Sequence, residues 1–432
     1  MLQTTAEIIS TLESAGRFRL AVVVRQYGEV ALSDYAKTLW QPLRHRTEIE
    51  PEFLAALAAE FRRLETGDAQ IQGWLESLQR TRTLQAAIHL TASEGPTFLA
   101  LHHLALSGMP QGESYLVGAY SGVPFANAAW SGCLNLAGRF PLEEIVALQA
   151  PGFAELRRAD ADRDRDGSER RLSLIPGNWR DARVGDSPIP EKLASLWPHL
   201  TETVRVLVPE PISGEPFSTW ANHFAAAQMR KLHPEADLVY FDLNEVIRDY
   251  LLSVLPNPDH ALHRMHFDTD CRARAEAAFR DVPWYTIPTE QKGRKRMEVL
   301  RCEQGELRGP TVTIPLELEI LLDGLWAKTL SPALLPVYTA LVPCNGLTCL
   351  GSFEQIEYLA EYRNGWASLE LFNPERLSTI RTDALTCGRC LDTSGIPVHP
   401  LDLLLDPEIE LTTPKTLLEL ITPLLPRLGV RR

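Results

Sequence analysis

Apolar side chains recur every three or four residues through much of the first hundred positions, which is the spacing of one helix face. In residues 50–65, EPEFLAALAAEFRRLE, apolar side chains share such a face, and Pro51 suits a first helical position. Residues 71–90, IQGWLESLQRTRTLQAAIHL, continue with similar spacing. The pattern predicts a helical layer at the start of the fold.

The pattern changes after residue 200, where short β-branched runs alternate with amphipathic segments. It predicts, in chain order, a strand, a helix, a buried strand and a helix: 203–208, 220–234, 236–242 and 244–255. Strands and helices that alternate with short connections favour a parallel sheet of the Rossmann type. We therefore expect an α/β fold with a Rossmann-like parallel sheet core, an N-terminal helical layer and a mixed C-terminal segment.

The length of 432 residues exceeds that of one ordinary core and indicates more than one region. We expect a helical region over residues 1–110 and a Rossmann-like core over residues 111–300. Within that core, the polar segment 155–190 is expected to form an inserted loop. Residues 301–432 are expected to complete the core and to end in a helical tail.

Charge and hydropathy narrow the classes of function. The formal net charge of −13 argues against a nucleic-acid partner, because phosphate binding requires a basic surface. The sequence shows no long apolar run and has a polar N-terminus, so we expect neither a membrane partner nor a signal peptide. The expected compartment is the cytoplasm and the expected partner is a small-molecule substrate. A homodimer is compatible with the sequence, which does not fix the oligomeric state.

Residues 116–133, LVGAYSGVPFANAAWSGC, have the order of a strand, a glycine turn and a helix start. In such a turn the backbone of Gly118, Ser121 and Gly122 approaches a ligand closely, and backbone amides hold an anion. The Asn127 side chain would then hydrogen-bond a polar edge of the ligand. The alternatives are a tight turn packed with small side chains and an Asn127 that satisfies only its own turn.

Two polar residues, Asp242 and Asn244, lie at the end of the strand predicted at 236–242 and just after it. Ligands of open α/β sheets bind at the carboxyl ends of the strands, so both are candidate ligand contacts. The alternative is that they cap the helix that follows. Gly351 belongs to a later turn that introduces a helix capped by Ser352, and the amides of a helix N-terminus favour an anion.

Cysteine and histidine spacing offers two candidate metal sites. Two close pairs of cysteines supply enough thiolates for a tetrahedral zinc ion: Cys344, Cys349, Cys387 and Cys390. The alternative is that they are reduced thiols in loops, and the odd total of seven cysteines does not fit a secreted disulfide framework. Three histidines spaced three apart are a second candidate, with a polar helix end as the alternative: His260, His263 and His266.

Four stretches of the chain form a pattern through their order and separation. The first is VGAYSGVPF, with Gly118 and Gly122 in the glycine positions, and the second is FSTWANHFAAAQMRKLHPEADLVYFDLNEVIRDYL. The third is LSPALLPVYTALVPCNGLTCLGSFEQIEYLAEY, which contains Tyr358, and the fourth is FNPERLSTI, which contains Arg376. Together they resemble the cysteine ligase family of bacillithiol synthesis, the BshC-like family. The chain departs from the family pattern because it lacks the E-D-H-D motif and the C-terminal coiled coil.

This resemblance implies a Rossmann-like ligase or transferase that joins an amino acid, cysteine or a similar one, to a small amino-sugar or acid acceptor. A nucleotide is a compatible cofactor. Such a site needs a cation, a general base and an orienting carboxylate, which we assign to Arg376, His223 and Glu354. Gly351 and Tyr358 are further expected ligand contacts.

The alternatives to these catalytic roles are structural. His223 is equally compatible with a helix surface, Glu354 with a helix cap and Arg376 with a surface salt bridge. A second hypothesis for the whole chain is therefore a non-catalytic binding or assembly protein that retains the fold and is stabilised by zinc.

Overall fold

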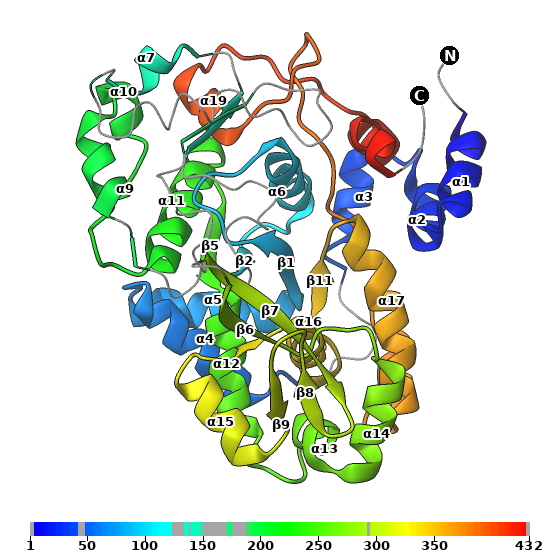
Figure 1. Ribbon diagram of the computed structural model, residues 1–432. Coiled ribbons are helices and arrows are strands. Elements are labelled where there is room, and N and C mark those ends of the chain that lie inside the picture. Colours follow the sequence, from blue (N-terminus) through cyan, green and yellow to red (C-terminus); the bar gives the residue numbers. More distant parts are fainter. Residues whose placement is uncertain are drawn as a thin grey trace.

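The structure is a computed structural model that describes residues 4–41, 48–122, 134–137, 140–147, 149, 171–174, 188–189, 191–291 and 294–428. It is an α/β protein with a four-stranded parallel sheet at its centre and a separate five-stranded antiparallel sheet (Figure 1). The expected fold class is confirmed, because the parallel core is of the Rossmann-like kind. None of the described helices is long and apolar enough to cross a membrane.

The parallel sheet has the strand order β11-β1-β2-β5. Its strands are β1 (Thr83–His89), β2 (Ser114–Tyr120), β5 (Asp237–Asp242) and β11 (Thr348–Leu350). From β1 the chain adds β2 and β5 on one side and returns much later to place β11 on the other. The strand order therefore reverses between β1 and β11, and open α/β sheets bind ligands beside the carboxyl ends of strands at such a reversal.

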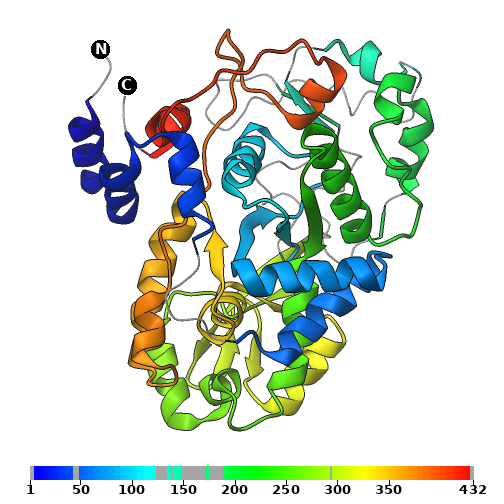
Figure 2. The same ribbon diagram turned by 180° about the vertical axis from the view of Figure 1, so that it is seen from behind.

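Alternate residues of the strands pack into two hydrophobic clusters, one on each face of the sheet. On β2, Tyr115 and Val117 belong to one cluster and Leu116 to the other. The first cluster includes α6 (Pro96–Gly108) and α11 (Phe217–Leu232), and the second includes α4 (Pro51–Arg63), α5 (Asp68–Thr81) and α12 (Leu243–Val254). Figure 2 shows the blue helices α4 and α5 beside the sheet from behind.

The antiparallel sheet forms one end of the molecule together with neighbouring helices (Figure 1). Its strand order is β10-β6-β7-β8-β9. The strands are β6 (Tyr285–Gln291), β7 (Arg294–Glu303), β8 (Glu306–Arg308), β9 (Thr313–Pro315) and β10 (Ser331–Pro332). The helices at this end are α13 (Ala261–Phe267), α14 (Thr269–Ala278) and α15 (Leu318–Trp326). β10 lies against α12, so the two sheets meet near the carboxyl end of β5.

The remaining elements surround the parallel sheet. At the N-terminal end, α1 (Thr5–Ser14) and α2 (Phe18–Tyr27) pack together, and α2 also lies against α17 (Phe353–Ser368). The other described elements are α3 (Leu32–Thr38), β3 (Leu134–Ala137), α7 (Leu142–Ile145), β4 (Arg171–Leu174), α9 (Glu191–Leu196), η3 (Trp197–His199), α10 (Glu202–Arg205), α16 (Leu334–Thr339), the π-helix η4 (Ala340–Cys344), α18 (Pro374–Thr379), α19 (Pro400–Leu405), α20 (Leu417–Ile421) and η5 (Thr422–Leu428).

Three of the four elements predicted after residue 200 are confirmed as α11, β5 and α12. The strand predicted at 203–208 is wrong, because the first half of this segment belongs to the short helix α10 (Glu202–Arg205). Val204 and Val208 are buried while Val206 is 67% exposed, and this pattern has the period of a helix turn. In a strand, all three valines would point to the same face.

The helix predicted over residues 71–90 is right only for its first half. α5 ends at Thr81, and Arg82 adopts a left-handed conformation with φ of 56°. The chain then enters β1, so the sheet already begins inside the region expected to be helical. The parallel sheet takes β1 from the expected region 1–110, β2 and β5 from the region 111–300, and β11 from the region 301–432.

Candidate active site at the carboxyl edge of the parallel sheet

The ends of β2 and β5 lie side by side because the two strands pair in parallel, with Ala119 opposite Asp242. The chain leaves β2 through Ser121 and leaves β5 directly into α12. The residues predicted as ligand contacts from these two separate segments therefore meet at one edge of the sheet.

Hydrogen bonds join four of the predicted residues at this edge. The Ser121 hydroxyl donates to Asp242 Oδ1 over 2.7 Å. Asn244 Oδ1 accepts from the amides of Ser121 (3.1 Å) and Gly122 (2.9 Å). Asp242 Oδ1 also accepts from the Asn244 amide over 3.0 Å, which makes Asp242 the N-cap of α12. The helix-capping interpretation of Asp242 is thus correct, and the amides expected to hold an anion already contact the Asn244 side chain.

Asp242 retains one carboxylate oxygen with no hydrogen-bond partner, Oδ2, although the residue is only 1% exposed. Burial, together with the nearby carboxylates of Glu245 and Glu60, raises the pKa of Asp242 from 3.8 to about 8. The Asp242 amide donates to Glu60 Oε1 over 2.9 Å. A carboxyl group that titrates near neutral pH and has a free oxygen is suited to taking up and releasing a proton.

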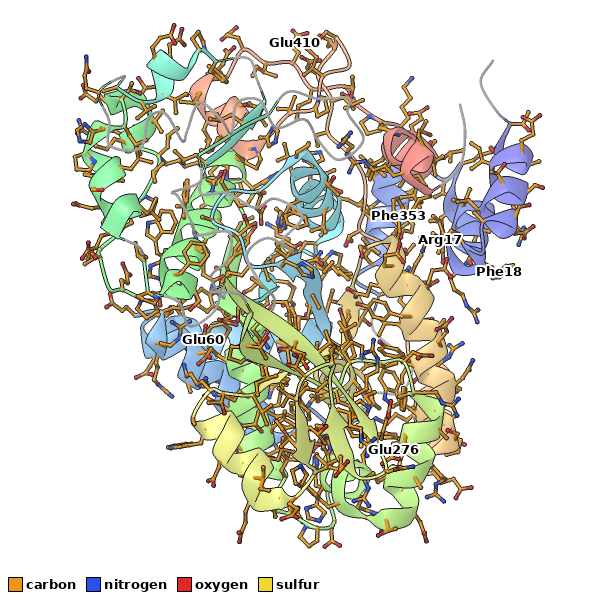
Figure 3. The ribbon with its side chains drawn as sticks, in the orientation of Figure 1. Arg17, Phe18, Glu60, Glu276, Phe353 and Glu410 are labelled. Atoms are coloured by element: carbon orange, nitrogen blue, oxygen red, sulfur yellow. The ribbon has the colours of Figure 1, made fainter. Side chains whose placement is uncertain are left out.

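Glu60, on α4, supports Asp242 from the side and was not expected from the sequence. It is 3% exposed and forms two 2.6 Å contacts with Arg63, which also donates to the Thr219 hydroxyl over 2.5 Å. Figure 3 shows Glu60 on the helix beside the sheet. Burial raises the pKa of Glu60. Its charge next to that of Asp242 favours the protonated form of the Asp242 carboxyl group.

Gly118 and Gly122 have packing reasons for the absence of a side chain. Gly118 lies inside β2, where a Cβ atom would approach Phe241 Cζ to 3.1 Å and the Leu243 side chain to 3.4 Å. At Gly122 a Cβ atom would lie 2.6 Å from Asn244 Nδ2. Gly118 therefore lets α12 pack close to the sheet, and Gly122 lets the Asn244 side chain reach the backbone. The predicted Asn127 lies outside the described residues.

A second polar group lies at the carboxyl end of β1. Glu94, in the connection to α6, is 1% exposed and lies 3.0 Å from His102 Nε2 at its nearer oxygen. The Tyr240 hydroxyl donates to Glu94 Oε1 over 3.0 Å, and the Tyr115 hydroxyl lies 3.1 Å from His102 Nδ1. Burial raises the pKa of Tyr240 well above 10, and the neighbouring Glu94 adds to this effect. This buried network adjoins the strand reversal, where a ligand is expected.

This network was not expected from the sequence, because the end of β1 lies inside a segment predicted as a helix. A signal was present: the run TASEGP at 91–96 has small residues, a glycine and then a proline suited to a first helical position. Gly95 is the N-cap of α6 and Pro96 is its first residue. A strand followed by this turn would have pointed to Glu94.

The three residues predicted as catalytic lie on three different helices and are not assembled into one site. His223 is an exposed residue of α11, which matches the helix-surface alternative. Glu354 is a 62% exposed residue of α17 that pairs with Arg17 at 2.6 Å. Figure 3 shows Arg17 near the start of α17, where Phe353 is labelled. Arg376, on α18, donates to the Cys344 carbonyl group.

Tyr358 and Gly351 belong to a buried hydrogen-bonded group after β11. The Tyr358 hydroxyl donates to that of Tyr338 over 2.9 Å, and the Tyr338 hydroxyl donates to Gln355 Oε1 over 2.9 Å. A Cβ atom at Gly351 would lie 2.4 Å from Gln355 Cδ. These residues thus fix the start of α17 at the strand end next to β1, on the other side of the reversal.

The four cysteines predicted to bind zinc do not form one cluster. Cys344, Cys349 and Cys387 are buried, Cys390 is partly buried, and burial raises the pKa of each thiol. In the part of the chain that the structure describes, one group of three metal-ligand atoms lies within 4.8 Å, and it contains Cys344 with Glu50 and His260. His263 and His266 instead bond to the carbonyl groups of Leu255 and Leu262.

Comparison of the chain with protein-family models, curated proteins and solved structures found no match.

Proposed function

We propose that this chain is an enzyme of the ligase or transferase type that binds a small polar substrate at the carboxyl edge of its parallel sheet. The observation that carries the proposal is the free, buried Oδ2 of Asp242, in a carboxyl group whose pKa is about 8. General bases work best when their pKa lies near the operating pH. Asp242 also lies on the carboxyl edge of the parallel sheet, the edge at which open α/β sheets bind ligands, although β5 is two strands away from the reversal beside β1.

In this reaction Asp242 acts on the nucleophilic substrate. Oδ2 takes the proton of an amine as the amine nitrogen bonds to the acceptor, and the leaving group departs from the acceptor with its electron pair. Ser121 and the two amides at the start of α12 hold Oδ1, so the free oxygen keeps a fixed direction. An amino acid such as cysteine as nucleophile, and an amino-sugar or acid as acceptor, are proposed on the resemblance described above.

A second candidate is a non-catalytic binding or assembly protein with the same fold. Two observations favour it: Asn244 occupies the amides of Ser121 and Gly122, and His223, Glu354 and Arg376 lie apart. Such a protein would bind a ligand at this edge without a proton acceptor. The two candidates differ in whether the Asp242 carboxylate is needed after the ligand has bound.

The test combines ligand screening with the Asp242→Asn variant. Asparagine caps a helix about as well as aspartate, so this variant removes the carboxylate while keeping the N-cap. The wild-type chain is screened by thermal shift against nucleotides, amino acids including cysteine, and amino-sugar acids, since binding to the folded state raises the Tm. The compounds that bind are then assayed for turnover in the wild type, in Asp242→Asn and in a matched control, Asp249→Asn, whose carboxylate lies on the same helix and is 40% exposed.

We expect Asp242→Asn to bind the ligand and to lose at least about 100-fold in turnover, because general-base catalysis contributes about 10²–10⁴-fold. Asp249→Asn should retain both. Ligand binding without turnover in the wild type would favour the binding protein. Full turnover in Asp242→Asn would remove Asp242 from the mechanism, and a folded wild type that binds none of the three classes would overturn both candidates.

A further inference from the structure

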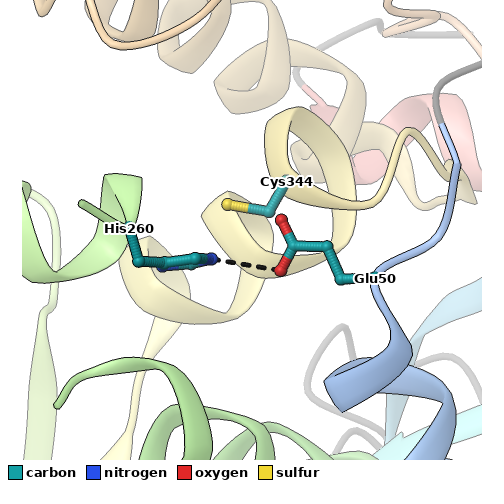
Figure 4. Close-up of side chains that lie close together, drawn as sticks. All are labelled: Glu50, His260 and Cys344. Carbon is teal, nitrogen blue, oxygen red and sulfur yellow. Dashed lines mark hydrogen bonds and ion pairs between the residues drawn. The ribbon is translucent and has the colours of Figure 1, made fainter. Parts of the chain in front are cut away.

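A carboxylate, an imidazole and a thiol, all side chains of types that bind metal ions in proteins, lie close together away from the sheet edge (Figure 4). Glu50 immediately precedes α4, His260 immediately precedes α13 and Cys344 ends the π-helix η4. One carboxylate oxygen, one imidazole nitrogen and the thiol sulfur all lie within 4.8 Å of one another. The three residues are far apart in the sequence, so the fold brings them together.

The group is shielded at one end and open at the other. Cys344 is 3% exposed, whereas the side chains of Glu50 and His260 are 28% and 13% exposed. Glu50 Oε2 lies 3.1 Å from His260 Nε2 and also accepts from the Tyr250 hydroxyl. Two of the three side chains are therefore partly accessible to solvent, and the sulfur is buried behind the surface.

We propose that Glu50, His260 and Cys344 bind a zinc ion. Sulfur, imidazole nitrogen and carboxylate oxygen are the ligands that zinc takes in proteins, at about 2.0–2.3 Å, which places tetrahedral ligand atoms about 3.3–3.7 Å apart. The observed ligand atoms lie within 4.8 Å of one another, so their separations exceed these values by at most about 1.5 Å. Three protein ligands leave one coordination position for water or a substrate atom. The site is separate from Asp242, so it goes beyond the proposed function.

In the metal-free chain a proton occupies the place that zinc would take. His260 Nδ1 accepts the Leu262 amide over 3.2 Å, so the neutral ring carries its proton on Nε2 and donates it to Glu50. Nε2 can bind zinc only without its proton, so the single N–H proton of the neutral ring has to move to Nδ1. The Leu262 amide then loses its acceptor. Zinc binding should therefore remove the hydrogen bond that caps the first turn of α13. It would at the same time link His260, at the start of that turn, to Glu50 and Cys344.

Two neighbouring residues position the ligands. The Tyr250 hydroxyl holds the Glu50 carboxylate, and such outer contacts tune metal affinity. Arg376 donates to the Cys344 carbonyl group and has no hydrogen-bond partner at Nε. Its charge offsets that of Glu50 in the free chain and favours the thiolate of Cys344 once zinc displaces the thiol proton. Arg376, predicted as a catalytic cation, is instead a positioning residue in this proposal.

The test uses the full chain, which is stripped of metal with a chelator and titrated with zinc chloride against a chromophoric competitor. We expect binding at this site and a zinc-dependent rise in Tm. Cys344→Ser should weaken this binding by more than about 100-fold, since it removes a ligand. Tyr250→Phe keeps all three ligands and should weaken it by about 10-fold.

Cys349→Ser is the matched control, because Cys349 is another buried thiol that lies outside the group. It should bind zinc like the wild type, and this result separates the present site from one built on the cysteine pairs. Should Cys344→Ser fail to fold, the wild-type chain loaded with Co²⁺ is decisive: we expect a tetrahedral spectrum with one thiolate and faster hydrogen exchange at the Leu262 amide. Absence of zinc binding in the wild type, unchanged binding in Cys344→Ser, or its loss in Cys349→Ser would each overturn the proposal.

Discussion

The Ser121 hydroxyl and the Asp242 carboxylate are joined by a 2.7 Å hydrogen bond between the ends of two neighbouring parallel strands. The bond fixes one oxygen of Asp242 and leaves the other buried without a partner. A buried carboxylate with one unpaired oxygen costs free energy in its charged form, and protonation removes much of this cost. The same feature that suits Asp242 to proton transfer therefore makes the stability of the chain depend on pH.

The first prediction concerns that pH dependence. In the folded state the pKa of Asp242 is about 8, whereas its ordinary value is 3.8. Between these values the folded chain holds a proton that the unfolded chain releases. The stabilisation from Asp242 is therefore complete below about pH 4 and is lost as the pH rises towards 8, by at most about 1.4 kcal/mol per pH unit.

Urea unfolding of the wild type and of Asp242→Asn measures this loss. The asparagine side chain does not titrate, so the free energy of unfolding of the variant should rise relative to that of the wild type from about pH 5 to about pH 8. The groups that face Asp242 are Glu60, Glu245, Arg63 and Ser121, and both proteins contain all of them. A difference that does not change with pH would show that Asp242 is already charged in the folded chain.

The second prediction concerns Asn244, which satisfies three backbone groups at the site. Its Oδ1 accepts from the Ser121 and Gly122 amides, and its Nδ2 donates to the Pro332 carbonyl group. Asn244→Ala leaves the two buried amides unpaired, at about 1–3 kcal/mol each, while the Pro332 carbonyl group keeps the Tyr120 hydroxyl as a donor. We therefore expect a loss of about 2–6 kcal/mol in the free energy of unfolding. Asn257→Ala, which removes one exposed contact to the Asp259 amide, should cost less than about 1 kcal/mol. Equal losses in the two variants would contradict the role of Asn244.

The order of predicted helices and strands along the chain was enough to predict two residues of the site, Asp242 and Asn244. The apolar run at β5 lies between two amphipathic helices, and this order was enough to place Asp242 and Asn244 at the carboxyl edge. The adjacent β1 was missed because its residues follow α5 with an apolar spacing that also fits a helix, and the break is one left-handed residue, Arg82. The opposite mistake occurred at Val204 and Val208, where a strand was predicted and the structure has a helix turn. A short valine-rich segment fits both the strand period and the helix period.

Contacts between segments that are distant in the chain could not be predicted from the sequence. Glu60 looks like one more charged residue on a surface helix, and its partner Asp242 lies 182 positions away. Glu50 and His260 are 210 positions apart and come together through the packing of α4 against α12. The cysteine spacing, by contrast, suggested a zinc site that the fold does not assemble, because sequence proximity does not fix the direction of side chains.

The third prediction contrasts two glycines. Gly118→Val places a branched side chain against Phe241 and Leu243, and overpacking of this kind costs about 1–3 kcal/mol. Gly73, in α5, is exposed and has nothing within 4 Å of an added Cβ atom. Gly73→Ala should therefore stabilise the chain by about 0.5–1 kcal/mol through helix propensity. Chemical denaturation measures the free energy of unfolding of both variants. An unchanged value in Gly118→Val would show that α12 has room to move away from β2.

The last prediction compares two glutamates of α17 that face the N-terminal helices. α2 has no side-chain cap of its own, and Glu357 accepts from the amides of Arg19 and Leu20 in its first turn, at 3.1 and 3.0 Å. Glu357→Ala leaves those amides without this acceptor and removes a negative charge from a helix N-terminus, so we expect a loss of about 1–2 kcal/mol. Glu354→Ala removes only a pair with Arg17 in which the glutamate is 62% exposed, so its cost should stay below about 1 kcal/mol. Denaturant unfolding measures the free energy of unfolding of both variants. Neither residue lies at the Asp242 site, so both variants should keep the ligand binding and turnover of the wild type. Loss of turnover in Glu354→Ala with unchanged stability would instead show that Glu354 is a catalytic carboxylate.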